Sequence, residues 1–248
     1  MSPFLKIAKS TTVVAVAGSC LLALLVSGCA GRVAPVARTG ELPTDFPVGR
    51  YERALAQGAA VYRVDPEGSL LQIVAGRDGA LARMGHDHLV ASRDLQGYLM
   101  LTADATHLQA DIVAPLDRMS VDEPGLRADA GLPAEVPDDA REGTRANMLA
   151  SLEADDYPWV SVGTDALLPG HGPREVGANL RVIVILHGVS REIEIPVSAV
   201  IDADRISAET AFTIRQTDFG VEPYSVLGGA LRVKDELSVR ARLQAFRQ

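Results

Sequence analysis

One segment near the C-terminus alternates strictly between apolar and polar residues: Leu237-Ser238-Val239-Arg240-Ala241-Arg242-Leu243-Gln244-Ala245. Successive side chains of a β-strand point to opposite faces of the sheet, so this segment predicts a strand with one apolar and one solvated face. The same alternation recurs at residues 193–201 and 208–214. We therefore expect a largely antiparallel sheet whose apolar faces pack against one another.

The pattern places strands at residues 59–64, 69–77, 89–93, 97–104, 107–115, 159–168, 175–186, 190–201, 205–214 and 234–244. Turn-forming segments such as Asp65-Pro66-Glu67-Gly68 lie between them, and such short connections favour up-and-down order. Residues 120–156 break the pattern, since they are acidic and rich in Pro and Gly, and residues 139–152 predict a short helix capped by Asp138 or Asp139.

These elements predict an all-β fold that is either a sandwich or a barrel of about eight strands, with the short helix and a long loop at one mouth. The apolar positions include many alanines, which either pack a tight core or leave room for a ligand. The relevant residues are Ala75, Ala110, Ala114, Ala178, Ala199, Ala208, Ala241 and Ala245. Aromatic residues make up only 4% of the chain, so rings would not fill a wide lumen.

The N-terminus has the features of a secretory signal. Lys6 and Lys9 precede an apolar run over residues 11–26, and Cys29 follows a small-residue site. The segment resembles a bacterial lipoprotein signal, with Cys29 as the acylated first residue of the mature chain. Residue 30 is Ala rather than Asp, which by resemblance to lipoprotein sorting patterns favours the outer membrane. We expect a signal peptide at 1–28, a flexible tether at 29–56, a single barrel domain at 57–248, and a location on the periplasmic face of a bacterial membrane.

Charge and cysteine content limit the partners. Removing residues 1–28 would remove two lysines and no acidic residue, which takes the net charge from −8 to −10. A nucleic-acid partner is therefore not expected, and membrane attachment would depend on the acyl anchor. Because Cys20 would be removed and Cys29 acylated, the mature protein would contain no disulfide.

Several segments in fixed order resemble the YceI family of bacterial periplasmic proteins. They are Tyr62-Arg63-Val64-Asp65-Pro66-Glu67-Gly68-Ser69, Gly85-His86-Asp87-His88, Leu152-Glu153-Ala154-Asp155-Asp156-Tyr157-Pro158-Trp159-Val160, Leu186-His187-Gly188-Val189-Ser190-Arg191-Glu192-Ile193-Glu194-Ile195-Pro196-Val197 and Arg215-Gln216-Thr217-Asp218-Phe219-Gly220-Val221. The resemblance covers roughly residues 59–245. The chain departs from the commonest family pattern in its second histidine and its expected lipid anchor, and its acidic insert at residues 120–156 resembles a subset of the family.

The resemblance implies a lipocalin-like antiparallel barrel whose lumen takes a polyisoprenoid, such as a polyprenyl phosphate or the tail of a quinone. It implies a carrier or sequestering protein with that lipid as its ligand, and the sequence assigns no certain cofactor. The chain has no Gly-x-Ser-x-Gly motif, phosphate-binding glycine loop or dinucleotide fingerprint, so we do not expect an enzyme. A solidly packed barrel that acts as an interaction protein is a further alternative.

Strand parity selects the lumen candidates Leu71, Ile73, Ile112, Val182, Val184, Ile195, Phe212, Leu237 and Val239. Trp159 is added as a candidate, although a lone Trp at the start of a strand more often packs in a core.

Four polar residues are candidates for contact with a head group: Arg83, His86, His88 and Arg215. Either arginine could bind phosphate oxygens, although Arg215 could instead pair with Asp218. His86 and His88 would lie on the same side of a strand, where they could anchor a turn or line the barrel mouth through hydrogen bonds, or could ligate a metal ion or haem. A third ligand could come from His107, His171, His187 or Asp87, and the spacing selects none of them. A metal- or haem-binding module is therefore the alternative function.

Overall fold

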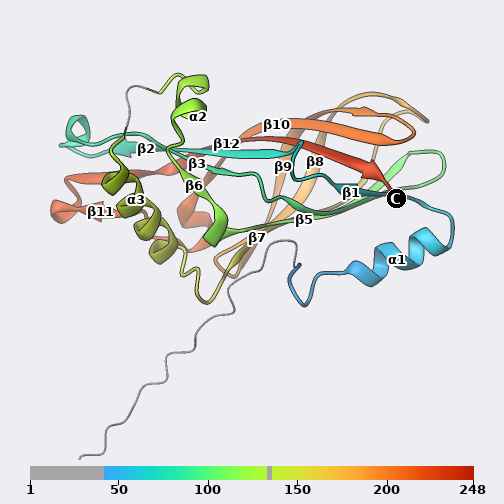
Figure 1. Ribbon diagram of the computed structural model, residues 1–248, viewed down its shortest axis with the longest axis horizontal. Coiled ribbons are helices and arrows are strands. Elements are labelled where there is room, and N and C mark those ends of the chain that lie inside the picture. Colours follow the sequence, from blue (N-terminus) through green and yellow to red (C-terminus); the bar gives the residue numbers. More distant parts are fainter. Residues whose placement is uncertain (1–41, 133–135) are drawn as a thin grey trace, which may run out of the picture. The chain divides into compact units, whose positions relative to one another are not determined.

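The computed structural model describes residues 42–132 and 136–248 (Figure 1). Its strands are β1 (Ala60–Val64), β2 (Leu70–Asp78), β3 (His88–Ser92), β4 (Gln96–Leu101), β5 (His107–Pro115), β6 (Ser120–Val121), β7 (Trp159–Leu167), β8 (Arg174–Leu186), β9 (Val189–Ile201), β10 (Arg205–Arg215), β11 (Ser225–Val226) and β12 (Leu231–Arg247). The helices are α1 (Val48–Ala56), α2 (Pro124–Asp129) and α3 (Asp138–Ser151). Short 3₁₀ turns are η1 (Ala82–Met84), η2 (Leu116–Arg118), η3 (Gln216–Phe219) and η4 (Leu227–Gly229).

The strands form a closed antiparallel barrel of eight strands. Neighbours follow the order β1-β4-β5-β7-β8-β9-β10-β12, and β12 pairs back with β1 to close the ring. β12 is long enough to pair with two partners in succession, because Val64 of β1 lies opposite Ala245 and Leu70 of β2 lies opposite Arg242. β3 pairs with β2, and β6 pairs with β3, so these segments continue the barrel wall beyond β1 and β4.

The sequence prediction of an all-β antiparallel barrel of about eight strands is confirmed. Each expected strand is present with ends that differ by no more than three residues, and the helix expected at 139–152 is α3. The dipeptide strands β6 and β11 and the helix α2 are too short to leave a periodic signal. Among the described residues, no helix is long and apolar enough to cross a membrane.

The tether expected at 29–56 differs from the structure at its end, because residues 48–56 form helix α1. Tyr51 and Ala54 are buried on one face of this helix, where the Tyr51 ring stacks on Tyr98 with 5.2 Å between centroids. The Tyr51 hydroxyl also donates to Asp111 Oδ2 at 2.7 Å. Burial of an aromatic side chain therefore holds α1 against the outside of β1 and β4. The signal peptide, Cys29 and residues 30–41 lie outside the described residues.

Candidate ligand-binding lumen

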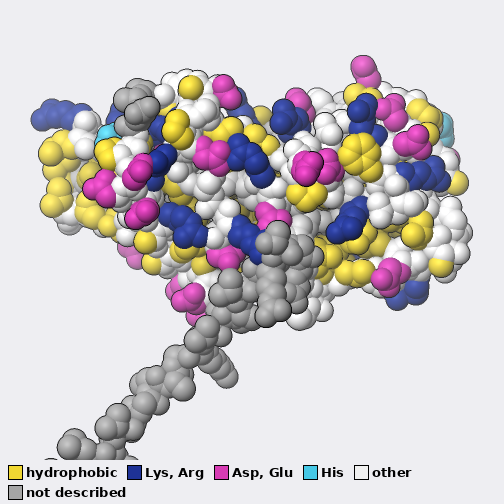
Figure 2. Space-filling view, viewed as in Figure 1, with side chains coloured by type: hydrophobic (Ala, Val, Ile, Leu, Met, Phe, Trp, Pro, Cys, Tyr) yellow, Lys and Arg dark blue, Asp and Glu magenta, His cyan; other side chains and the backbone are white. Residues whose placement is uncertain are grey.

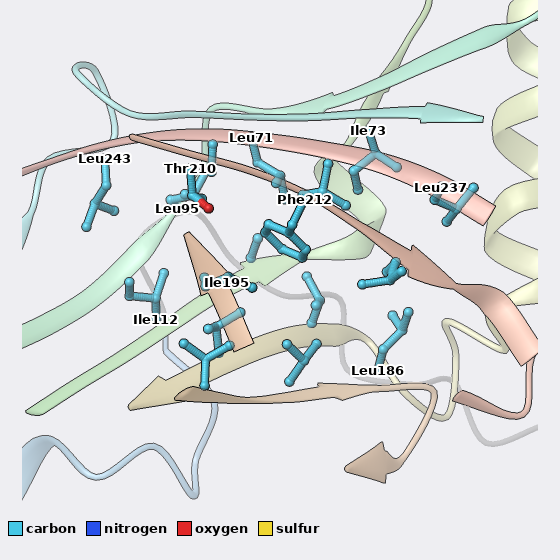
Figure 3. Close-up of a pocket in the computed structure, with 18 of the residues that line it drawn as sticks. Leu71, Ile73, Leu95, Ile112, Leu186, Ile195, Thr210, Phe212, Leu237 and Leu243 are labelled. Carbon is cyan, nitrogen blue, oxygen red and sulfur yellow. The ribbon is translucent and has the colours of Figure 1, made fainter. Parts of the chain in front are cut away.

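The barrel encloses a cavity of about 410 Å³, within the range of cavities that hold small ligands. Side chains from β2, β5, β7, β8, β9, β10 and β12 line it almost entirely with carbon. Figure 3 shows Leu71, Ile73, Ile112, Ile195, Phe212 and Leu237 projecting from their strands into this space. A solidly packed interior, which was one alternative from the sequence, is therefore wrong.

The lumen candidates that strand parity selected all line the cavity in the structure. The cavity is lined by Leu71, Ile73, Ile112, Val182, Val184, Ile195, Phe212, Leu237 and Val239. Trp159 does not line it, whereas Val160 and Val162 on the same strand do. Because side chains alternate along β7, Trp159 has the opposite parity from these valines and faces away from the lumen.

Small side chains account for much of the open space. Seven of the eight alanines singled out in the sequence line the cavity: Ala75, Ala110, Ala114, Ala178, Ala199, Ala208 and Ala241. The exception, Ala245, is fully buried in the core. Since alanine adds only one carbon beyond the backbone, these positions leave a volume that leucine or phenylalanine would fill.

A proline marks the place, about midway along the cavity, where β9 and β10 stop pairing. The β9–β10 ladder runs from Ile201 opposite Ile206 to Val197 opposite Thr210 and ends there. The next residue of β9 is Pro196, which has no N–H to donate, and its carbonyl accepts instead from the Thr210 hydroxyl at 2.7 Å. Beyond this point η3 contacts both strands.

One end of the lumen is closed by tightly packed apolar side chains. We call this the packed end, and its residues are Tyr62, Leu99, Leu101, Leu108, Ile201 and Ile206. Each of these residues is at most 9% exposed. A ligand that reaches this end therefore meets only hydrocarbon.

The other end has a polar lining. We call it the mouth, and its polar residues are His88, Thr144, Asn147, Ser151, Gln216 and Tyr224. Thr144, Asn147 and Ser151, together with Met148, have the helical spacing i, i+3, i+7 and i+4, so α3 presents one face to the cavity. The expectation of a helix across one mouth is met by this face of α3.

At the mouth, His88 is held by a buried carboxylate. Its Nδ1 atom lies 2.6 Å from Asp122 Oδ2, and Asp122 also accepts from the Leu89 N–H at 2.8 Å and from Arg127 at 2.5 Å. Asp122 is 1% exposed and has a positive φ of 54°, which is costly for a residue other than glycine. The surrounding hydrogen bonds therefore fix a strained residue in place.

The charge of Asp122 decides which imidazole nitrogen a ligand meets. Burial raises the pKa of Asp122, but hydrogen bonds from His88, Leu89 and Arg127 outweigh that effect and lower the pKa below its ordinary value. An ionised carboxylate only accepts hydrogen bonds, so the His88 Nδ1 atom carries the hydrogen. The Nε2 atom makes no further hydrogen bond among the described residues and is left for a ligand.

The other three head-group candidates do not line the cavity. Arg83 and His86 are exposed on the segment that precedes β3. Arg215 has the outward parity at the end of β10, between Ile214 and Gln216, which line the lumen. Its guanidinium pairs with Asp235, with 3.6 Å between Nε and Oδ2, rather than with Asp218. Of the four, only His88 lies where a ligand in the lumen would meet it.

The histidine pair does not form a metal centre by itself. The rings of His86 and His88 lie 6.3 Å apart between centroids. No group of three or more His, Cys, Asp or Glu side chains suited to a metal ion occurs within residues 42–132 and 136–248. His107 is engaged with Asp165, and His187 Nδ1 lies 3.2 Å from the Phe219 carbonyl oxygen.

Sequence reasoning missed Asp122, Arg127 and the polar face of α3. The spacing of Thr144, Asn147 and Ser151 could have indicated the face of α3, because it is one side of a helix. Asp122 gives no such signal, since only the fold brings it to the His88 ring.

A family model for the YceI-like domain matches residues 62–245, which is most of the chain. The chain belongs to the YceI-like domain family. No curated protein is similar enough in sequence to count as a match.

Two solved structures share the barrel of this YceI-like protein. One is a polyisoprenoid-binding domain from Saccharophagus degradans implicated in plant cell wall breakdown, with a TM-score of 0.52 and 14% identity, covering 75% of this chain and 98% of that one. The other is BcnA from Burkholderia cenocepacia, with a TM-score of 0.52 and 13% identity, covering 73% of this chain and 98% of that one. At this level of identity the likeness establishes the fold.

Proposed function

We propose that this protein binds a polyisoprenoid lipid in its barrel and acts as a carrier or sequestering protein for it. The observation that carries the proposal is the apolar cavity of about 410 Å³ inside a closed barrel. A structural neighbour is described as a polyisoprenoid-binding domain, which supports the same ligand class here. The mode of action is binding, without a chemical step.

The chemistry of the lumen fits an isoprenoid chain. Such a chain has almost nothing to hydrogen-bond, and each CH₂ removed from water contributes about 0.8 kcal/mol. The hydroxyl groups of Thr164 and Thr210, which line the cavity, already donate to the Arg181 and Pro196 carbonyl oxygens at 2.8 and 2.7 Å. The wall of the lumen therefore offers hydrocarbon contact rather than polar recognition.

The difference between the two ends gives the ligand a direction. The tail would point to the packed end, and the head group would lie at the mouth, within reach of His88 and Asn147. A polyprenol, a polyprenyl phosphate and an isoprenoid quinone all have this form, with one polar group on a long apolar chain. Arg83, His86 and Arg215 are not part of this proposed site.

We further propose that the protein is tethered by acylated Cys29 to the periplasmic face of a bacterial membrane, in the outer membrane where the cell has one. The support is the lipoprotein-like signal at residues 1–29. Replacing Cys29 by Ser is expected to move the protein from the membrane fraction to the soluble fraction. Retention of the Cys29→Ser protein in the membrane fraction would contradict the anchor.

Mass spectrometry of an organic extract of the purified protein tests the ligand. We expect an isoprenoid in the extract, and we expect added solanesol, a long polyprenol, to raise the melting temperature. The matched control is the double variant Ala178→Phe, Ala241→Phe, in which two rings occupy the middle of the lumen. An extract without lipid, together with an unchanged melting temperature on adding solanesol, would refute the proposal.

A further inference from the structure

Two turns lie side by side next to the mouth. One covers residues 79–86 and the other residues 224–231, and we call them together the tip. The Leu81 N–H donates to the Ala230 carbonyl at 2.8 Å. A Cβ on Gly79 would come within 2.5 Å of the same carbonyl oxygen, so this close approach requires glycine there. The two turns therefore form one surface.

The tip exposes large apolar side chains. Met84 is 67% exposed, Leu227 is 68% exposed, and Tyr224 is 41% exposed. Leu227 has a positive φ of 53°, a conformation that is costly for a leucine. No packing of its side chain against the barrel compensates for this cost, because that side chain is exposed. An exposed leucine in a strained turn therefore indicates contact with another molecule or surface rather than packing within the fold.

The charge of the tip is unlike that of the rest of the chain. The chain has 32 acidic residues, yet residues 79–86 and 224–231 contain none, and Arg83 is their one arginine. Arg83 is exposed and forms no ion pair within the described part of the chain. In Figure 2, hydrophobic side chains gather at the left end, where β2 and β11 end in Figure 1, with Lys or Arg side chains beside them.

The tip is continuous with the lumen. Tyr224 belongs to both, and Val233 and Leu237, which follow the second turn on β12, line the cavity together with His88. On the other turn, a Cβ on Gly85 would lie 2.9 Å from the Leu231 side chain. A surface of apolar residues, one interfacial aromatic ring and an arginine thus borders the opening of an apolar cavity.

We propose that the tip inserts into the surface of a lipid bilayer and presents the mouth to it. The proposal rests on the proposed function, because a long isoprenoid pays a large penalty in water and must pass directly between bilayer and lumen. Apolar side chains with a neighbouring aromatic ring and arginine suit the bilayer interface. A bilayer with anionic lipids also complements Arg83, and the missing carboxylates avoid repulsion from it.

Quenching of tryptophan fluorescence by brominated lipids tests directly whether the tip inserts into a bilayer. Trp159 is the only tryptophan of the chain, so a Trp159→Phe background allows a single reporter to be placed at will. Met84→Trp reports on the tip, and Leu167→Trp is the control, since Leu167 is 80% exposed on β7 away from the mouth. With vesicles of phosphatidylethanolamine and brominated phosphatidylglycerol, we expect the tryptophan fluorescence to be quenched and its emission to shift to the blue only for Met84→Trp. Equal quenching of both, or of neither, would overturn the proposal.

The rate of solanesol transfer from vesicles to the protein tests whether tip insertion speeds loading of the lumen. The full-length double variant Met84→Ser, Leu227→Ser is compared with Leu167→Ser, and any anchor acts equally in both. Extraction of solanesol from vesicles is expected to slow by about tenfold or more in the tip variant alone, with equilibrium binding of detergent-dispersed solanesol unchanged. Extraction by the tip variant at the wild-type rate would overturn the proposal.

Two further outcomes distinguish bilayer insertion from the ligand proposal and from a dimer interface at the tip. If wild-type protein retains no solanesol but the tip reporter is quenched, the ligand proposal fails and bilayer insertion stands. If sedimentation shows a dimer that depends on Met84 and Leu227, and the tip reporter is not quenched, the tip is an interface between two copies and the proposal fails.

Discussion

At the packed end, buried apolar side chains of β1, β4, β5, β9 and β10 close the barrel and border the end of the cavity, whereas at the mouth side chains of β2, β10, β12 and α3 line the cavity. Both ends have the same strand alternation, so alternation alone does not decide whether a barrel is filled. At the packed end the residues are large, as with Tyr62 and Leu101. In the middle of the lumen they are alanines, and at the mouth a helix with polar side chains replaces a strand as part of the wall.

The largest expected effect tests this contrast through stability. Leu101 is 2% exposed and belongs to the packed end, so Leu101→Ala should lower the free energy of unfolding by about 2–5 kcal/mol. Ile73 already faces a cavity, so Ile73→Ala should cost less, about 1–2 kcal/mol. Urea denaturation of both variants measures the difference. Equal losses would contradict the distinction between packed and lined regions.

The second prediction concerns the row of small residues across the middle. Ala178 faces Val197, which faces Thr210, and Thr210 faces Ala241, so the two alanines lie on one level of the barrel. The double variant Ala178→Phe, Ala241→Phe should weaken solanesol binding by about a hundredfold, while filling the cavity should leave stability unchanged or raised. Ala211→Phe, on an exposed position of β10, is the control and should bind normally. Undiminished binding by the double variant would exclude the lumen as the binding site.

The third prediction tests the polar mouth. His88→Phe removes the Nε2 atom while keeping a ring, and it should weaken solanesol binding about two- to tenfold, the value of one hydrogen bond. Squalene, an isoprenoid hydrocarbon with no hydroxyl, should bind the variant and the wild type equally. Titration calorimetry with both ligands separates these outcomes. An equal loss for squalene would show that His88 acts only through packing.

The smallest effect concerns acid stability at the mouth. Because the folded-state pKa of Asp122 lies below its ordinary value of 3.8, its contribution to stability is present above that pH and is lost as the pH falls through the folded-state pKa. Wild-type stability should therefore decline on acidification below about pH 4, and Asp122→Asn should flatten part of that decline. Parallel denaturation curves for the two proteins across this range would contradict the assignment of a lowered pKa to Asp122.

The sequence allowed much of the barrel to be predicted, because a two-residue period identifies both strands and the side they bury. The same parity chose Ile73, Phe212 and Leu237 for the lumen, and it could have rejected Trp159, since Val160 and Val162 mark the inward face of β7. Helix α1 was missed because its few apolar residues lie in a stretch rich in small residues and proline.

The mouth was harder to predict because its residues come from distant segments. In the sequence, strands β4 and β5 and the turn η2 lie between His88 and Asp122. The contact between the two side chains depends on the pairing of β3 with β6. Arg83, His86 and Arg215 had suitable chemistry for a head group, but chemistry does not reveal which way a side chain points. Side-chain alternation could have excluded only Arg215, because Arg215 follows the apolar Ile214 on a strand that the sequence pattern identifies and so points to the opposite side.

The pairing of β12 with β1 has a consequence for biosynthesis. Val64 and Ala245 lie opposite each other, so the ring cannot close until residues from both ends of the domain exist together. At about 5–20 residues per second, synthesis of the intervening segment takes on the order of ten to forty seconds. During that time the apolar faces of the earlier strands have no partner, and we expect nascent chains stalled before residue 231 to be digested by protease. A holding factor that binds unfolded strands would then determine the yield of this barrel.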